Sequence, residues 1–222
     1  MTAIRLKGLR SGEELAAAAR SSLYLRLTEA FAFPSGALLG AIDSGRFAEE
    51  LRANAAALPF ELPVEGELSA DGELEQAYIR LFEVGPGQPP CPLYEGSHRG
   101  GRMKIMEELV RFYEHFGLQP GPGDQPDHLC AELEFMHYLA FKEAAALSQG
   151  GPVEAFVLAQ RDFLERHLCR WLPGLRLRLE TVDAPAFYRS LVSFAGAFAA
   201  GDLAFLKRRR AKPDTELVPL PD

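Results

Sequence analysis

Apolar residues in this chain recur at the spacing of an α-helix, and clusters of glycine and proline separate the recurring segments. One segment carries five apolar residues on a single helical stripe: Leu74, Ala77, Tyr78, Leu81 and Phe82. Charged side chains occupy the opposite side of that segment, as on a helix with one buried face. Comparable segments follow along the chain and no two alternating segments offer a strand pair, so the sequence predicts an all-α fold.

The other predicted helices follow the same pattern. Their approximate ranges are 14–33, 47–58, 103–116, 127–148, 152–172 and 185–206. Pro173 is predicted to end the helix that starts near Pro152, because proline lacks the N–H that a helix interior requires. Three leucines alternate within residues 175–179, but an isolated strand would have no partner. We therefore predict a helical turn or an irregular link there.

These elements predict a single-domain helical bundle of about eight helices over residues 1–212, with a Pro-rich tail at 213–222 that we expect to be disordered. Two long Pro/Gly loops interrupt the bundle. The first, residues 85–101, contains five glycines and four prolines, and the second covers residues 118–126. We predict irregular structure in both, and loops of this length are often functional.

Composition narrows the classes of partner. The 222 residues are 47% hydrophobic, enough for one large core, and 24 basic against 31 acidic residues give a net charge of −7. This charge disfavours binding to a phosphate backbone, so we predict no nucleic-acid partner. The three cysteines form no C-x-x-C pair, so neither a disulfide framework nor a zinc site is expected. We predict no cofactor or metal and a reducing compartment.

The hydropathy pattern also bears on localisation. Residues 1–10 run into a polar segment without the apolar core of a signal peptide. The most apolar stretch, residues 191–205, is interrupted by two glycines and an aspartate, and falls short of the roughly 18 to 20 apolar residues that span a bilayer. We therefore predict a cytoplasmic protein without stable membrane insertion.

A turn rich in glycine and proline delivers Asp127 and His128 to the start of a predicted helix. Projected at about 100° per residue, His128 and Glu132 fall on the apolar side of that helix, whereas Asp127 and Glu134 fall on the polar side. One interpretation is a buried His128–Glu132 pair that satisfies itself and fixes the helix. The other is a docking site, because a helix start presents unpaired N–H donors.

Enzymatic interpretations find little support, since the sequence has no phosphate loop, dinucleotide fingerprint or nucleophile elbow. Two Glu-x-x-His motifs, Glu95–His98 and Glu134–His137, leave a di-metal carboxylate helical-bundle enzyme as the alternative. Against it, Glu95 and His98 lie among glycines and prolines, and His137 is expected to project away from the apolar side. Two other histidines are predicted to be ordinary surface or core residues: His115 and His167.

Three segments resemble the cytoplasmic assembly chaperones of molybdenum oxidoreductases, the maturation proteins that bind twin-arginine leaders. They are Tyr78-Ile-Arg-Leu-Phe82, Pro92-Leu-Tyr94-Glu95 and Gln125-Pro-Asp-His-Leu-Cys-Ala-Glu-Leu-Glu-Phe-Met136. The family includes the chaperones of trimethylamine N-oxide, dimethyl sulfoxide and nitrate reductases. Residues 163–173 and 187–188 are also similar to its C-terminal helices, so the resemblance covers roughly residues 15–206.

The resemblance implies an all-α, non-catalytic protein. Such a protein holds the catalytic subunit of a molybdopterin oxidoreductase until the cofactor is inserted, and shields the twin-arginine leader of an exported client. Carried over residue by residue, it implies a client- and leader-binding surface made of Tyr78, Leu81, Phe82, Pro92, Tyr94, Glu95, Pro126, Asp127, His128 and Glu132. On this view the carboxylates face the paired arginines of the leader, and apolar side chains face its hydrophobic segment.

Overall fold

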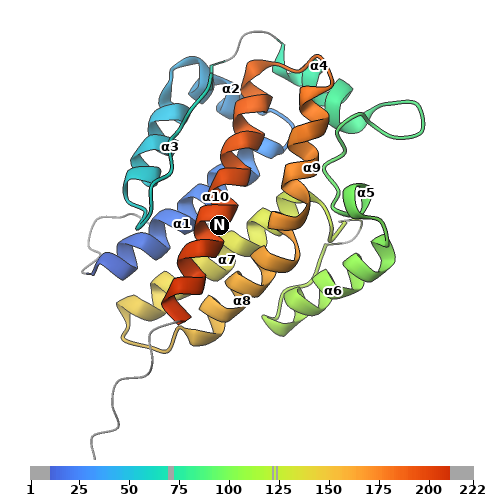
Figure 1. Cartoon of the computed structure of the whole chain (residues 1–222). Coiled ribbons are helices and arrows are strands. Elements are labelled where there is room, and N and C mark those ends of the chain that lie inside the picture. Colours follow the sequence, from blue (N-terminus) through green and yellow to red (C-terminus); the bar gives the residue numbers. More distant parts are fainter. Residues whose placement is uncertain (1–10, 70–72, 122, 124, 211–222) are drawn as a thin grey trace, which may run out of the picture.

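The computed structural model describes residues 11–69, 73–121, 123 and 125–210, and it is all-α as predicted (Figure 1). Its helices are α1 (Gly12–Phe31), α2 (Gly36–Asp43), α3 (Arg46–Ala56), α4 (Leu74–Tyr78), η1 (Ile79–Glu83), α5 (Gly96–Arg99), α6 (Arg102–His115), α7 (Leu129–Ser148), α8 (Glu154–Arg166), α9 (Leu168–Glu180) and α10 (Ala186–Arg210). The described residues form no strand, and an isolated antiparallel bridge joins Tyr94 to His128. The tail predicted at 213–222 lies outside the described residues.

Helices α1 and α7 form the most extensively packed pair in the bundle. They run antiparallel, since Ser21 Oγ lies 2.9 Å from His137 Nδ1 and Cys130 Sγ lies 3.6 Å from the carbonyl oxygen of Thr28. Four consecutive alanines, residues 16–19, are buried along α1 and permit the two backbones to approach closely. The prediction that His137 projects away from the core is wrong, because its ring is buried against α1.

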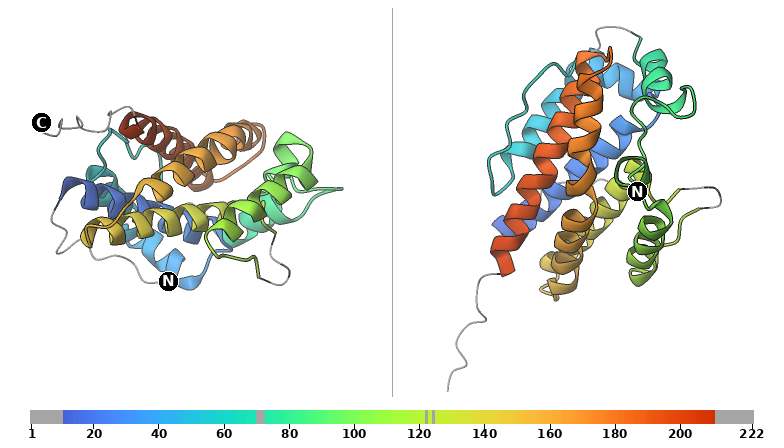
Figure 2. Two further views of the ribbon diagram at one scale, coloured as in Figure 1. Left: turned by 90° about the horizontal axis from the view of Figure 1, so that it is seen from below. Right: turned by 45° about the vertical axis from the view of Figure 1, so that its right-hand side comes forward.

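Helices α8, α9 and α10 form a second group of packed helices in the bundle, and α10 contacts both α8 and α9 (Figure 1). Helix α3 packs on α1, and α6 lies at one edge of the molecule (Figure 2). The five residues of the predicted stripe at 74–82 are all buried, in α4 and the π-helix η1. The π-turn is visible in the bond from Val84 N to Ile79 O, 2.9 Å long.

A buried charge network joins four helices through Arg20, and local spacing did not predict it. Arg20 Nε donates to Asp202 Oδ1 over 2.6 Å and Nη1 to Glu143 Oε2 over 2.9 Å, and Nη2 donates to Gln160. All four side chains are fully buried. Tyr24 adds a 2.7 Å hydrogen bond from its hydroxyl to Asp202. Glu143 also accepts a hydrogen bond from Arg209, so each buried charge has a partner of opposite charge, which is the condition for burying it.

Proline and glycine mislead the sequence-based prediction at two places. Pro173 lies inside α9, and the helix break falls earlier, at His167, whose φ is −120° and ψ is −96°. Pro173 sits on the exposed side of α9, where solvent can satisfy the carbonyl group that loses its N–H partner. Within the predicted 85–101 loop, the residues of α5 form one helical turn. Helix α2, between two predicted helices, was not predicted at all.

Helix α10 is long and apolar enough to cross a membrane by length and composition, from Ala186 to Arg209. In the structure it packs along the bundle, and Leu191, Phe198 and Leu206 are fully buried. A core helix meets the same length and composition criteria, so the packing of α10 accounts for its apolar character.

Candidate functional site

A cleft of about 520 Å³ opens between the segment around Tyr94, the end of α6, the 118–126 loop and the first turns of α7. Three tyrosines and a phenylalanine are among its lining residues, and we call it the aromatic cleft. The lining residues on which the argument depends are Tyr94, Tyr113, Pro126, His128, Phe135 and Tyr138. A cleft with apolar walls and a few convergent polar groups is the usual form of a binding site.

The antiparallel bridge builds one wall of the aromatic cleft. Glu95 N donates to the carbonyl oxygen of Asp127 over 2.9 Å, and Leu129 N donates to that of Leu93 over 2.8 Å. These bonds bring the rings of Tyr94 and His128 to a centroid distance of 5.0 Å in an edge-to-face arrangement. Two segments that the sequence predicted to share a surface therefore meet, and Tyr94, Pro126 and His128 all line the cleft.

Asp127 occupies a different position from the one predicted. It is fully buried instead of lying on a polar helix face. Its carboxylate accepts hydrogen bonds from Arg102 Nε at 2.9 Å, Arg102 Nη2 at 3.0 Å and the Gly96 N–H at 3.3 Å. The helical projection fails because α7 starts at Leu129 with His128 as its N-cap, so Asp127 precedes the helix. The carboxylate connects the two segments that form the cleft.

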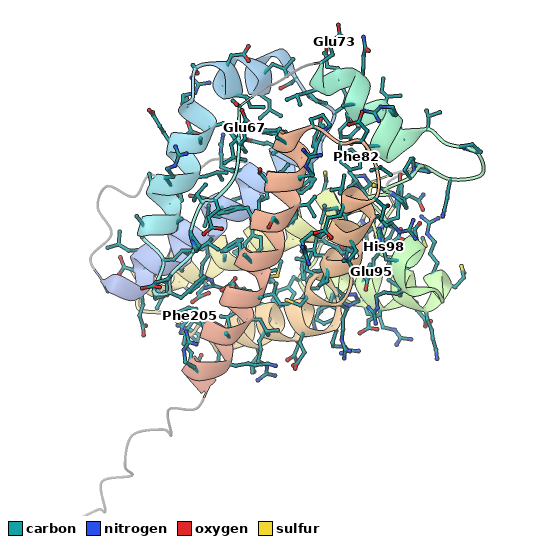
Figure 3. The ribbon with its side chains drawn as sticks, turned by 45° about the horizontal axis from the view of Figure 1, so that its top comes forward. Glu67, Glu73, Phe82, Glu95, His98 and Phe205 are labelled. Carbon is teal, nitrogen blue, oxygen red and sulfur yellow. The ribbon has the colours of Figure 1, made fainter. Side chains whose placement is uncertain are left out.

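Glu95 is also buried and internally paired. Its Oε2 lies 2.8 Å from His167 Nδ1, and its Oε1 accepts a hydrogen bond from Arg99. The prediction of His167 as an ordinary isolated histidine is therefore incomplete, because it orients a buried carboxylate of the candidate site. Figure 3 shows Glu95 beside His98, whose Nε2 lies 2.8 Å from the carbonyl oxygen of Pro92. Neither Glu95 nor Asp127 presents an unoccupied carboxylate to an arginine of a bound peptide.

Glu132 is fully buried beneath the cleft, and its hydrogen-bond donor is the indole of Trp171. Trp171 Nε1 donates to Glu132 Oε2 over 3.1 Å, and Nδ1 of His128 accepts from Cys130 N over 3.2 Å. The interpretation that His128 and Glu132 bond to each other in the core is therefore wrong, because Glu132 bonds to Trp171 instead. Burial, together with the neighbouring Glu95 carboxylate, raises the pKa of Glu132 well above its usual range.

Stability should depend on pH through Glu132. A raised pKa means that Glu132 keeps its proton in the folded state over a pH range in which the unfolded state releases it. The stabilisation of the folded state by this proton is complete below the unfolded pKa of about 4.3. It disappears as pH rises through the folded pKa. In the wild type the free energy of unfolding should therefore fall as pH rises. We expect Glu132→Gln to reduce this fall, because glutamine keeps an acceptor for Trp171 but carries no charge at any pH. Urea unfolding at a series of pH values measures this.

The matched control for that experiment is Glu134→Gln, which neutralises an exposed carboxylate two residues along the same helix. It should follow the wild-type profile. Equal pH profiles for wild type and Glu132→Gln would contradict the assignment of a raised pKa to Glu132.

Seven of the ten predicted site residues lie outside the cleft lining: the buried carboxylates Glu95, Asp127 and Glu132 described above, and four further residues. Tyr78, Leu81 and Phe82 are buried in the core, where the Tyr78 hydroxyl donates to Phe31 O over 3.1 Å. Figure 3 places Phe82 apart from Glu95 and His98. Pro92 is buried and accepts the contact from His98. These residues support the framework of the site.

Sequence reasoning missed several residues of the cleft. Tyr113, Phe135 and Tyr138 line it from α6 and α7, and Glu134 adds an exposed carboxylate at the same cleft. Phe135 and Tyr113 were assigned to helices, but nothing in helical spacing says which loop a helix face meets. The signal for Glu134 was its place on the polar side of α7, which the structure confirms.

The two Glu-x-x-His motifs point in different directions. Glu134 lies at the cleft, His137 packs against α1, and Glu95 pairs with His167. Among the residues that the structure describes, no group of three or more His, Cys, Asp or Glu side chains is arranged to hold a metal ion.

Comparison with known proteins decides the family. The sequence model described as nitrate reductase delta subunit matches residues 44–176, which is more than half of the chain. This chain belongs to that family. The matched region contains η1, α5, α6 and α7, and therefore every residue discussed above at the aromatic cleft.

Three similar proteins extend this result. The chain is 48% identical to the selenate reductase assembly chaperone of Thauera selenatis over 115 residues, which is 50% of this chain and 60% of that protein. It is 48% identical to the chlorate reductase assembly chaperone of Ideonella dechloratans over 114 residues, 50% of this chain and 59% of that protein. The dimethyl sulfide dehydrogenase assembly chaperone of Rhodovulum sulfidophilum is 36% identical over 191 residues, 79% of this chain and 75% of that protein.

The matches to the first two relatives thus span about three fifths of their length. All three are named as assembly chaperones of redox enzymes, and the names give no support to a di-metal enzyme.

Proposed function

We propose that this protein is a dedicated assembly chaperone that acts in the cytoplasm on the catalytic subunit of a molybdopterin oxidoreductase. It holds that subunit while the cofactor is inserted, and for an exported client it also binds the twin-arginine leader and so delays export. The chaperone itself carries out no bond chemistry. The observation that carries the proposal is the aromatic cleft at the meeting point of the 92–95 and 125–136 segments.

The walls of the cleft match the chemistry of a leader peptide. A leader combines arginines with an apolar segment, and the cleft combines three tyrosine rings and a phenylalanine with one exposed carboxylate. Tyr94 and Tyr138 are partly exposed and offer aromatic surface to apolar groups. Tyr113 and Phe135 are buried, and the Tyr113 hydroxyl donates to Pro126 O over 2.9 Å, so these two rings support the wall of the cleft. The net charge of −7 also favours approach of a basic segment over a nucleic acid.

The names of the relatives support the class of client. Selenate reductase, chlorate reductase and dimethyl sulfide dehydrogenase give their names to the chaperones most relevant here. The client of this chain is a redox enzyme of the same broad kind.

Co-expression tests the proposal directly. Catalytic subunits of the selenate reductase, chlorate reductase and dimethyl sulfide dehydrogenase classes are each produced with and without this chain, and their molybdenum content and activity are measured. One class should acquire molybdenum and activity only in the presence of the chain. Equal loading of every subunit without the chain would contradict a chaperone role.

Glu134 should contribute the electrostatic part of leader binding, since it is exposed at the cleft. Glu134→Gln should weaken binding of a twin-arginine leader peptide roughly two- to fivefold, the range expected of one exposed ion pair. The loss should shrink as salt rises, because exposed pairs are screened. Calorimetry at low and high salt measures both effects.

The control is Glu154→Gln, which removes an exposed carboxylate at the start of α8, outside the cleft lining. It should behave as the wild type. If all three proteins bind the leader with the same affinity and the same salt dependence, Glu134 makes no electrostatic contribution to leader binding.

A further inference from the structure

A guanidinium group of the protein itself already pairs with a fully buried carboxylate of the candidate site, that of Asp127. Arg102, the first residue of α6, binds the two carboxylate oxygens of Asp127 through Nε and Nη2 at 2.9 and 3.0 Å. Its Nη2 also donates to Gln125 Oε1 at 3.1 Å. This is the two-pronged geometry in which arginine recognises carboxylates most specifically.

The same guanidinium lies at the aromatic cleft. Its central carbon stands 5.2 Å from the centroid of the Tyr94 ring, within range of a cation–π interaction. Tyr94 and Gln125 both line the cleft. Arg102 therefore has a bidentate carboxylate, an amide oxygen and an aromatic face, which are the partners that an arginine side chain of a bound peptide would require.

Exposure differs sharply between the two members of this pair. The Arg102 side chain is 45% exposed, whereas that of Asp127 is 0% exposed. The pair thus has one buried member, held in place by the Gly96 N–H, and one member that solvent reaches. Arg102 also follows Gly100 and Gly101, whose φ values of 73° and 67° are accessible to glycine at little cost. Arg102 is therefore the member of the pair that can move away from the Asp127 carboxylate into solvent.

We infer that Arg102 competes, within the protein, with an arginine of the leader peptide for the Asp127 carboxylate and the Tyr94 ring. When the leader binds, its arginine replaces Arg102 at both groups. This inference rests on the proposed leader binding for the identity of the guest. The exchange keeps the number of bidentate pairs constant, so it adds little net affinity. It selects for a guanidinium against an ammonium, because lysine cannot reproduce the two parallel hydrogen bonds.

Peptide binding to an Arg102→Gln protein tests the competition. Without Arg102, the affinity for a leader with paired arginines should rise about tenfold or more, because no side chain of the protein has to leave Asp127 before the leader binds. The same leader with paired lysines should gain much less. The control Arg111→Gln removes an equal charge from α6 at a side chain that is 74% exposed and pairs with Glu107. Equal gains for both peptides, or weaker binding of the arginine peptide, would overturn the inference.

Chemical rescue provides a second test that requires no client. In an Arg102→Ala protein, guanidinium chloride far below the molar range that unfolds proteins should raise the melting temperature relative to sodium chloride at equal ionic strength. Ammonium chloride should not, and the wild type should show no rise. Lack of rescue by guanidinium would overturn the inference. Rescue without binding of any leader peptide would uphold the guanidinium site and count against the proposed leader binding instead.

Discussion

Replacing Arg20 by methionine should destabilise the protein by about 3 to 5 kcal/mol, the largest effect that we expect from a single substitution. Methionine fills much of the same volume but leaves Asp202 buried without a cation, while Glu143 keeps Arg209 as its remaining cation; both carboxylates are 0% exposed. The cost comes mainly from the Asp202 carboxylate, which is fully buried and has no other cation beside it. Urea unfolding followed by circular dichroism measures the difference.

The matched control is Arg46→Met, which breaks an exposed pair with Glu50, whose side chains are 62% and 40% exposed. It should cost less than about 1 kcal/mol, since exposed ion pairs contribute little. Similar losses for the two variants would mean that the Arg20 network does not hold the four helices together.

Asp127→Ala should reduce stability by about 2 kcal/mol and strongly reduce maturation of the client in cells. The stability loss exceeds that of a simple helix cap, because Asp127 accepts three hydrogen bonds, two of them from a charged group. The loss of function follows from the geometry, since without the carboxylate the 92–95 and 125–128 segments lose a connection that shapes the aromatic cleft. Thermal melts beside client activity separate the two effects.

Asp43→Ala serves as the control, because Asp43 is exposed at the end of α2, far from the cleft in sequence. It should change neither property. Wild-type client activity with a folded Asp127→Ala protein would make the Asp127–His128 turn purely structural and shift the functional surface elsewhere on the cleft.

Helical periodicity predicted most of the bundle because most of the longer helices bury apolar residues at a spacing that is visible in their own sequence. Helix ends are also determined locally: the Ser11 hydroxyl caps α1 by accepting from Glu14 N at 3.1 Å. Gly117 lies just past the end of α6, and its φ of 71° is a left-handed conformation that glycine adopts at little cost. Both features are local, and a single sequence contains all the information they need.

The candidate site depended on information of another kind. The projection of Asp127 failed because the helix begins two residues later, and the partner of Glu132 could not be found because Trp171 lies 39 residues away. Glu95 and His167 are separated by 72 residues. Spacing along one helix does not report which distant side chain will face it, so the resemblance located the region but not the pairing of its charges.

The Arg20 network also sets a condition on biosynthesis. Asp202 follows Arg20 by 182 residues, and at roughly 5 to 20 residues per second the ribosome needs on the order of ten to forty seconds to supply it. Until α10 emerges, the centre of α1 carries a cation without its full set of acceptors, and the N-terminal helices cannot close around it. Completion of the native core therefore waits for α10, and a nascent chain that stalls before Asp202 leaves the Arg20 network without one of its two carboxylates.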